Sequence, residues 1–179
     1  MDLGIDIPID EFTSWMCPRH TNAPSFEYPG DRLHRLSDFI PDYEMLGPAR
    51  NTHDHLGDPV IMVMKRGYGS GLTVGRLNTI RSFTRYVFED KPGKMSRDVA
   101  VLPRNSNSGP FSRPGDSGSS VVDGKGRISG MITGGAGVTD ILDCTYVASI
   151  NFLRNRMLAH GLEADCFSPA LQNAASPTL

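Results

Sequence analysis

The sequence predicts an all-β protein, an antiparallel six-stranded β-barrel with a C-terminal α-helix. The chain of 179 residues contains 19 Gly and 13 Pro, which favours a loop-rich β protein over a helical bundle. From Pro59 onward, short runs of apolar, β-branched and aromatic residues alternate with turn residues, as expected for short strands. Only the last predicted element has its apolar residues at helical spacing.

Six or seven short strands and one helix account for residues 60–158. Strands are predicted at residues 60–64, 72–75, 80–88, 98–102, 119–122, 127–133 and 145–149. The turn Asp123–Gly126 joins two of them as a hairpin. Helical spacing then predicts a helix over residues 150–158, with Ser149 as its N-cap and Gly161 beyond its end. This order is typical of a small antiparallel barrel with a helix packed against it.

The chain divides into three parts by composition. Residues 1–58 are predicted to be an irregular N-terminal segment, with an edge strand as the one candidate element at Ile5–Asp10. Residues 59–162 form the barrel and the helix. Residues 163–179 are rich in Ser, Pro and Ala and are predicted to be a loose tail. The length calls for one domain.

Charge and hydropathy exclude several classes of partner. The net charge of −2 provides no basic field, so we expect no nucleic-acid partner. No apolar run is long enough to cross a membrane, so no membrane association is expected. The N-terminus lacks the basic start and apolar core of a secretory signal, which leaves the compartment open, with the cytoplasm as the default expectation.

The cysteines indicate neither a disulfide framework nor a zinc site. Cys17, Cys144 and Cys166 are odd in number and widely spaced. They are predicted to be free, although the pattern leaves open a bridge between two of them. We expect no metal and no cofactor.

The stretch Arg113–Ser120 is the strongest candidate for chemistry. Gly115 and Gly118 flank Asp116 and Ser117, and glycines allow strained backbone angles and a close approach to a ligand. Such a turn can present the serine hydroxyl outward and direct backbone N–H groups at a developing negative charge. The alternative is an ordinary polar turn before a strand, because these residues are also the commonest turn formers.

The order of these features resembles the chymotrypsin/trypsin-like serine proteases of the PA clan. Pro114–Ser119 resembles the nucleophile motif of that family, and Lys65–Gly75 resembles the opening hairpin of its second barrel. Gly130–Gly135 falls where the substrate-lining strand follows, and Tyr146–Ile150 enters the terminal helix as in the family. The chain is also similar to uncharacterised fungal trypsin-like proteins. The resemblance covers residues 59–161 and implies the second barrel of a chymotrypsin-like fold.

The resemblance implies specific roles for the serine turn. Ser117 matches the acyl-forming nucleophile, and the backbone N–H groups of Gly115 and Ser117 match the oxyanion hole. Asp116 would anchor the turn through its carboxylate; alternatively, it is a turn residue that hydrogen-bonds its own backbone. The rival nucleophile elbow of α/β-hydrolases requires G-x-S-x-G, and Ser119 stands where its last glycine would be.

The resemblance also implies a peptide or protein substrate. Thr133, Gly134 and Gly135 would lie along the substrate backbone; alternatively, they are a strand end and loop. Phe111 occupies the place near the base of the specificity pocket where trypsin-type enzymes carry an acid. A preference for Lys or Arg is therefore not supported.

The resemblance fails at the general base. A serine hydroxyl needs a base, and in this family a histidine and then an orienting aspartate precede the serine. The predicted strands suffice for one barrel, so residues 1–58 would be a remnant of, or a linker from, a first barrel. Asp2–Ile5 resembles the motif of the orienting aspartate, which makes Asp2 a candidate; alternatively, Asp2 is an exposed terminal acid. If Asp2 has that role, the catalytic histidine would precede Met1.

None of the five histidines has the sequence context of the family base. They are His20, His34, His53, His55 and His160. Solvated loop positions are expected for them, with a substitute base among them left open.

Taken together, the resemblance implies a serine-type endopeptidase-like protein that hydrolyses peptide bonds by acyl transfer through Ser117. Without a base the chain is predicted to be truncated and weakly active or inactive. The alternative is a catalytically dead peptide-binding or regulatory module. A third possibility is a truncated gene product, whose lone barrel would expose the face that normally packs on its partner.

Overall fold

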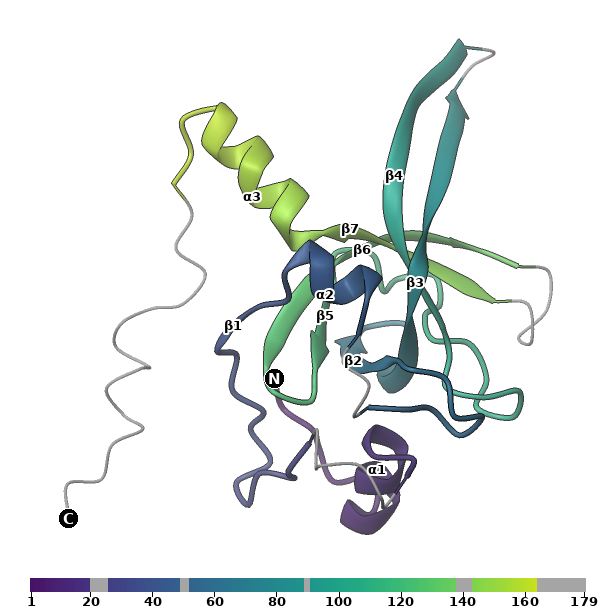
Figure 1. Ribbon diagram of the computed structural model, residues 1–179, viewed down its shortest axis with the longest axis vertical. Coiled ribbons are helices and arrows are strands. Elements are labelled where there is room, and N and C mark those ends of the chain that lie inside the picture. Colours follow the sequence, from purple (N-terminus) through teal and green to yellow (C-terminus); the bar gives the residue numbers. More distant parts are fainter. Residues whose placement is uncertain (20–25, 49–51, 89–90, 138–142, 164–179) are drawn as a thin grey trace.

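The computed structural model describes residues 1–19, 26–48, 52–88, 91–137 and 143–163, and its centre is a ring of six antiparallel strands (Figure 1). The strands are β2 (Ile61–Gly67), β3 (Gly71–Phe88), β4 (Lys91–Pro103), β5 (Ser120–Asp123), β6 (Arg127–Ala136) and β7 (Cys144–Ser149). They pair in the order β6-β5-β2-β3-β4-β7, and β7 pairs with β6 again. Helix α3 (Ile150–Ala159) follows β7 directly. The predicted fold class, with its terminal helix, is confirmed.

Strand β3 corrects the predicted element order. The two strands expected at 72–75 and 80–88 are one strand, whose pairing with β4 shifts register between Leu77 and Arg81. The intervening residues contain neither Gly nor Pro, so a bulge is enough to bend the strand without ending it. Its pairing with β2 ends at Leu77. Beyond this point β3 and β4 continue alone as a long ribbon that leaves the barrel (Figure 1).

In its described residues, the N-terminal segment contains two short helices where an irregular chain was expected. The predicted edge strand at Ile5–Asp10 is wrong, because helix α1 (Ile9–Met16) begins directly after Pro8. Acidic residues in its first turn, Asp10 and Glu11, favour this start through the helix dipole. Helix α2 (Asp42–Leu46) follows Pro41 in the same way. Among the described residues of this segment, strand pairing consists of the bridges of Asp2 with Leu33 and of His53 with Pro59, and of β1 (Asp38–Phe39), which is parallel to β6.

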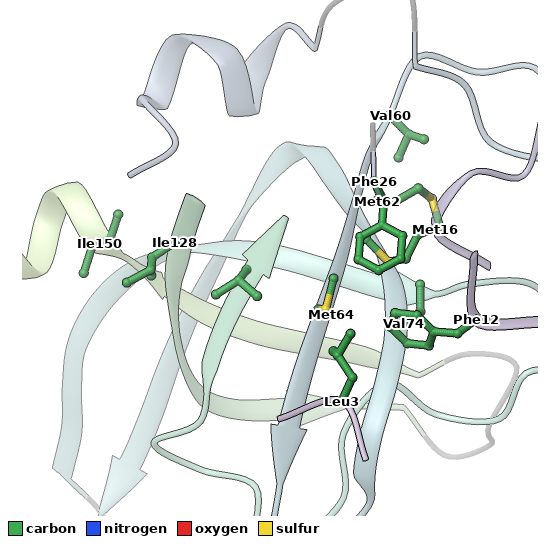
Figure 2. Packing of buried hydrophobic residues seen from close by; sticks show 11 residues of the cluster. Leu3, Phe12, Met16, Phe26, Val60, Met62, Met64, Val74, Ile128 and Ile150 are labelled. Carbon is green, nitrogen blue, oxygen red and sulfur yellow. The ribbon is translucent and has the colours of Figure 1, made fainter. Parts of the chain in front are cut away.

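The alternation of side chains along β2 divides the core into two layers. Ile61 and Val63 point into the ring, where they pack with residues of the other strands and with Phe111. Met62 and Met64 point outward. Figure 2 shows the outer layer, in which Leu3, Phe12, Met16 and Phe26 from the N-terminal segment cover Met62, Met64 and Val74. The N-terminal segment therefore covers an outer face of the barrel that a lone barrel would expose.

The structure also bears on the predictions about membrane-spanning segments, cysteines and the C-terminal tail. None of the described helices combines the length and the apolar character that crossing a membrane requires. Cys17 and Cys144 form no disulfide bond in the described part of the chain. Cys166, His20 and almost all of the predicted tail lie outside the described residues.

Replacing Phe12 by Ala tests whether the N-terminal segment is an integral part of the fold. Phe12 is buried and packs edge-on against the rings of Phe26 and Tyr28. We expect Phe12→Ala to lower the free energy of unfolding by about 3–5 kcal/mol, since a buried aromatic leaves a cavity. Urea denaturation followed by circular dichroism measures the change. The control is Tyr43→Ala, which removes an exposed ring and is expected to change stability by about 0.5 kcal/mol or less. Equal effects of the two substitutions would show that this layer does not contribute to the core.

Candidate active site

Residues 113–119 form a tight turn whose shape depends on two glycines. The Asp116 amide donates to the Arg113 carbonyl oxygen at 3.0 Å, and the Ser119 amide donates to the Asp116 carbonyl oxygen at 3.0 Å. Gly115 has φ = +100° and Gly118 has φ = +88°, both in the region that only glycine adopts without strain. The chain therefore reverses on each side of Asp116 and Ser117.

The turn is joined to strand β6. The Gly118 amide donates to the Ile132 carbonyl oxygen at 2.9 Å, and the Ile132 amide donates to the Ser119 carbonyl oxygen at 3.0 Å. These bonds bring the serine turn beside Thr133–Gly135, where a bulge interrupts the pairing of β6 with β7. Thr133 is exposed, and its hydroxyl donates to the Tyr146 carbonyl oxygen at 3.3 Å. The predicted nucleophile and the predicted substrate-lining strand are thus neighbours.

The carboxylate of Asp116 is the centre of a buried polar network. It accepts hydrogen bonds from Lys65 Nζ at 2.8 Å and from Ser70 Oγ at 2.6 Å. It also accepts from the amides of Gly69 at 2.7 Å, Ser70 at 3.1 Å and Arg113 at 2.9 Å. Five donors thus hold this side chain, and they come from two segments far apart in the sequence. Asp116 fastens the serine turn to the β2–β3 hairpin.

Lys65 supplies the charge that pairs with Asp116. It follows Ile61 and Val63 on the inward face of β2, and its side chain is fully buried. Besides Asp116, its ammonium contacts Ser70 Oγ and donates to the Gly71 carbonyl oxygen at 3.1 Å. In the sequence, Lys65 stood out only as the first residue of the hairpin segment Lys65–Gly75. The signal was there, because a lysine at an inward position of an apolar strand needs a buried partner.

Burial and pairing act in opposite directions on the two charged groups. Burial alone would raise the pKa of the Asp116 carboxyl, but hydrogen bonds from Lys65, Ser70 and the amides hold this pKa well below its ordinary value. Burial lowers the pKa of the Lys65 ammonium, and the hydrogen bond and charge of Asp116 oppose that change. The direct ion pair and its completed hydrogen bonds keep both groups ionised at neutral pH.

The β2–β3 hairpin contacts the serine turn through glycines. A Cβ atom at Gly67 would overlap the Asp116 carboxylate, and a Cβ atom at Gly69 would overlap the Pro114 carbonyl oxygen. Only a residue without a side chain allows this approach. The glycine-rich hairpin sequence is therefore part of the candidate site.

The serine turn leaves three polar groups available to a ligand. Ser117 is exposed, and within the described part of the chain its hydroxyl has no hydrogen-bond partner. The backbone N–H groups of Gly115 and Ser117 likewise donate no hydrogen bond there. A hydroxyl and two unused N–H groups in one rigid turn are the parts that an acyl-transfer site requires.

Asp2 and the described histidines form no hydrogen bond with Ser117. The Asp2 carboxylate accepts the Gly4 amide at 2.7 Å, and its carbonyl oxygen accepts from Arg66 at 3.2 Å. The expected solvated position is wrong for His34, which is buried beside Phe26 with its Nε2 2.9 Å from the Asp123 carbonyl oxygen.

The other histidines lie elsewhere. His160, just after the end of α3, has its Nε2 3.0 Å from the Arg156 guanidinium. His53 forms an isolated β-bridge with Pro59. The described residues thus contain no group hydrogen-bonded to Ser117 that would act as its base.

Phe111 belongs to the core of the barrel. Its ring is buried beside Gly75, where a Cβ atom would approach it to 2.6 Å. Its amide donates to Asp143 Oδ2 at 3.2 Å, and its carbonyl oxygen accepts from Thr73 Oγ1 at 2.7 Å. The predicted contact between this side chain and a substrate does not fit its burial.

No cluster of three or more His, Cys, Asp or Glu side chains is placed to hold a metal ion in the part of the chain described. Burial, with a smaller effect of the Asp143 charge, raises the pKa of the Cys144 thiol. This keeps Cys144 in its less reactive, protonated form near neutral pH.

Three solved structures with similar folds are proteases. A protease from Nocardiopsis is 22% identical with a TM-score of 0.39, the match covering 55% of this chain and 47% of that one. A chymotrypsin from Cellulomonas bogoriensis is 21% identical with a TM-score of 0.40, and the match covers 72% of this chain and 61% of that one. A glutamic acid-specific serine protease that uses a histidine triad in substrate binding is 14% identical with a TM-score of 0.44. That match covers 79% of this chain and 60% of the protease.

These similarities are too remote to assign a family or an activity. All three TM-scores lie below 0.5, and this chain spans less than two thirds of each protease. No family model matches the chain, and no curated protein matches it. The resemblance to fungal trypsin-like proteins therefore stays a prediction.

Removing the buried cation tests the anchor of the serine turn. We expect Lys65→Met to lower the free energy of unfolding by about 3–5 kcal/mol, because it leaves the Asp116 carboxylate buried without a counter-charge. Urea denaturation at pH 7 measures the loss. Lys125→Met removes an exposed lysine and is the control, with an expected change within about 0.5 kcal/mol. A loss no larger than that of the control would mean that the turn does not depend on this ion pair.

The stability of the protein should also fall in acid because of Asp116. The folded state holds the pKa of this carboxyl below its ordinary value of 3.8, so its contribution is complete above about pH 5. As the pH falls further, the unfolded chain takes up a proton before the folded chain does, and the free energy of unfolding decreases. Denaturation curves between pH 5 and pH 2 should show a smaller decrease for Asp116→Asn than for the wild type or for the exposed control Asp38→Asn. Parallel decreases for all three would contradict this role.

Proposed function

We propose that the protein is a serine-type endopeptidase-like protein whose acyl-transfer site is the Ser117 turn. The observation that supports this proposal most directly is the exposed Ser117 hydroxyl beside the two unused N–H groups of Gly115 and Ser117, in a turn fixed by Asp116 and Lys65. The buried anchor holds these groups in one arrangement, because a buried polar network in which every group is paired is rigid.

Each residue has a defined part in the proposed reaction. The Ser117 Oγ attacks the carbonyl carbon of a peptide bond, and the amine leaves with a proton, which gives an acyl-serine that water then hydrolyses. The N–H groups of Gly115 and Ser117 donate to the oxyanion that forms during attack. Asp116 does not touch the substrate and acts by positioning these groups.

The exposed end of β6 is the proposed docking strand for the peptide. Thr133 and Gly135 are exposed at and just after the bulge, one and three residues beyond Ile132, whose hydrogen bonds join β6 to the serine turn. An extended peptide that pairs with this segment would pass beside Ser117. The glycines leave room for a substrate side chain.

Catalysis by the described residues alone is proposed to be weak. Ser117 has no hydrogen-bonded base in them, and Asp2 uses its carboxylate within its own loop. In serine proteases, loss of the triad leaves roughly 10³–10⁴-fold acceleration over water from the oxyanion hole and binding. Full activity would need a base from another segment or chain.

A peptide-binding module without turnover is the second candidate. The described residues provide no base for Ser117, whereas peptide binding by the docking strand and the oxyanion donors does not require one. This supports the binding module. The two candidates differ in whether the Ser117 oxygen reacts.

Labelling by a fluorophosphonate probe tests the reactivity of Ser117. Attack by Oγ forms a bond to phosphorus and releases fluoride, so the adduct is identified on the Ser117 peptide by mass spectrometry. We expect slow labelling of the wild type, none of Ser117→Ala, and unchanged labelling of Ser120→Ala, the neighbouring exposed serine. Absence of labelling after long exposure to a folded wild type would reject the acyl-transfer proposal.

Peptide binding then separates the second candidate from an inert fold. Equilibrium binding of a peptide library to the wild type and to Ser117→Ala is measured. A binding module should give equal affinities for the two proteins, and the wild type should not cleave the peptides. A large substitution at the docking strand, Gly135→Trp, should abolish that binding. Retained binding in Gly135→Trp would place the peptide elsewhere.

A further inference from the structure

The ribbon formed by β3 and β4 is the most conspicuous feature that the proposed site does not use. Pairing of β3 with β2 ends at Leu77, and pairing of β4 with β7 begins only at Val99. Among the described residues, the outer edges of the ribbon between these points are therefore unpaired. The ribbon extends well beyond the barrel, at the end of the molecule opposite α1 (Figure 1). A two-stranded ribbon without further support is marginally stable in water.

The two faces of this ribbon differ in chemistry. Residues directly opposite each other in an antiparallel pair share a face, and the pairs are Phe83 with Arg97 and Arg85 with Met95. Phe83 is 65% exposed and Met95 is 60% exposed. We call these four residues the basic-apolar face.

On the other face, the polar groups near the middle of the ribbon are satisfied internally. There the hydroxyls of Thr84 and Ser96 both donate to Asp98 Oδ2 at 2.6 Å. Polar groups with partners within the ribbon do not call for a further ligand. The basic-apolar face is therefore the side that calls for a partner.

Within the described part of the chain, two cations of the basic-apolar face have no ion-pair partner. Arg81, nearer the barrel, pairs with Asp42 at 3.0 Å, but Arg85 and Arg97 form no ion pair in the described part of the chain. Two exposed apolar side chains beside two cations fit a partner surface that is apolar and acidic.

This chain itself carries such a surface in residues 5–10, which lead into the first turn of α1. Ile5 is 71% exposed and Ile9 is 52% exposed, and each is followed by an exposed acid, Asp6 and Asp10. The whole chain has the same charge asymmetry, with an acidic N-terminal part and a basic remainder. Residues 1–58 contain 4 Lys and Arg against 11 Asp and Glu, and residues 59–179 contain 14 against 9. We call residues 5–10 the acidic-apolar segment.

We propose that the basic-apolar face of one molecule binds the acidic-apolar segment of a second copy of this chain. The two surfaces lie at opposite ends of the molecule, so they meet only between molecules (Figure 1). A symmetric contact of ribbon with ribbon would place Arg85 and Arg97 against the same cations, which costs free energy. The contact is therefore head to tail, and such contacts add further copies instead of stopping at a dimer.

The size of the ribbon sets the strength of this contact. About ten residues per strand, at about 3.3 Å each, give a face roughly 30 Å long and about two strands wide. That is a few hundred Å² on each partner, below the approximately 800 Å² typical of a stable interface. The association is therefore weak and requires high protein concentration. It does not depend on the reactivity of Ser117.

Sedimentation equilibrium over a concentration series tests the proposal. The weight-average mass should equal the monomer mass of 19.5 kDa at low micromolar concentration and rise past twice that value near the millimolar range. Because the contact joins opposite charges, 1 M NaCl should return the mass towards that of the monomer. A monomer at every concentration, or association that 1 M NaCl strengthens, would overturn the proposal.

Two complementary variants test the head-to-tail geometry. Arg85→Gln with Arg97→Gln alters only the ribbon, and Asp6→Asn with Asp10→Asn alters only the acidic-apolar segment. Each double variant should weaken self-association by about tenfold. An equimolar mixture should form a 1:1 complex and no larger species, because only one intact pair of surfaces remains.

A charge-matched control completes the test. Lys125→Gln with Arg156→Gln removes two exposed cations away from the ribbon and should associate like the wild type. Equal weakening in this control, or growth of the mixture beyond the 1:1 complex, would reject the proposed contact.

Discussion

The ion pair between Lys65 and Asp116 is the interaction on which the rest of the candidate site depends. Both side chains are fully buried, and together with Ser70 and the amides around them they leave no charge without a partner. Such a network is costly to remove from water but strongly specifies one arrangement once every donor and acceptor is paired. It joins the first hairpin of the barrel to the serine turn and so fixes the direction of the Gly115 and Ser117 N–H groups.

The two layers of the core explain how this barrel exists beside a short N-terminal segment. The inward side chains of β2 fill the ring, and its outward methionines are covered by Phe12, Met16 and their neighbours. Residues that look irregular in the sequence thus bury an outer face of the barrel. The same segment carries most of the acidic residues, so the part that completes the core also sets the polarity of the molecule.

The sequence allowed the barrel strands, the terminal helix and the serine turn to be located, because apolar periodicity and glycine–aspartate–serine patterns are local signals. The sequence did not predict that two of these strands are one continuous strand, β3. A bulge has no sequence signal as clear as Gly or Pro. Helix α1 was missed because alternation at Ile5–Asp10 imitated a strand. The partner of Asp116 was missed because contacts 51 residues apart are set by tertiary packing.

The close approach of Gly67 and Gly69 to the serine turn has a consequence for tracing relatives of this chain. Neither position can gain a side chain unless Asp116 or Pro114 moves, and Lys65 cannot change alone. Evolutionary drift in the hairpin and in the serine turn must therefore be concerted. A two-part signature that pairs Lys65–Ser70 with Pro114–Gly118 would thus distinguish descendants of this site more selectively than the common glycine–aspartate–serine–glycine string alone.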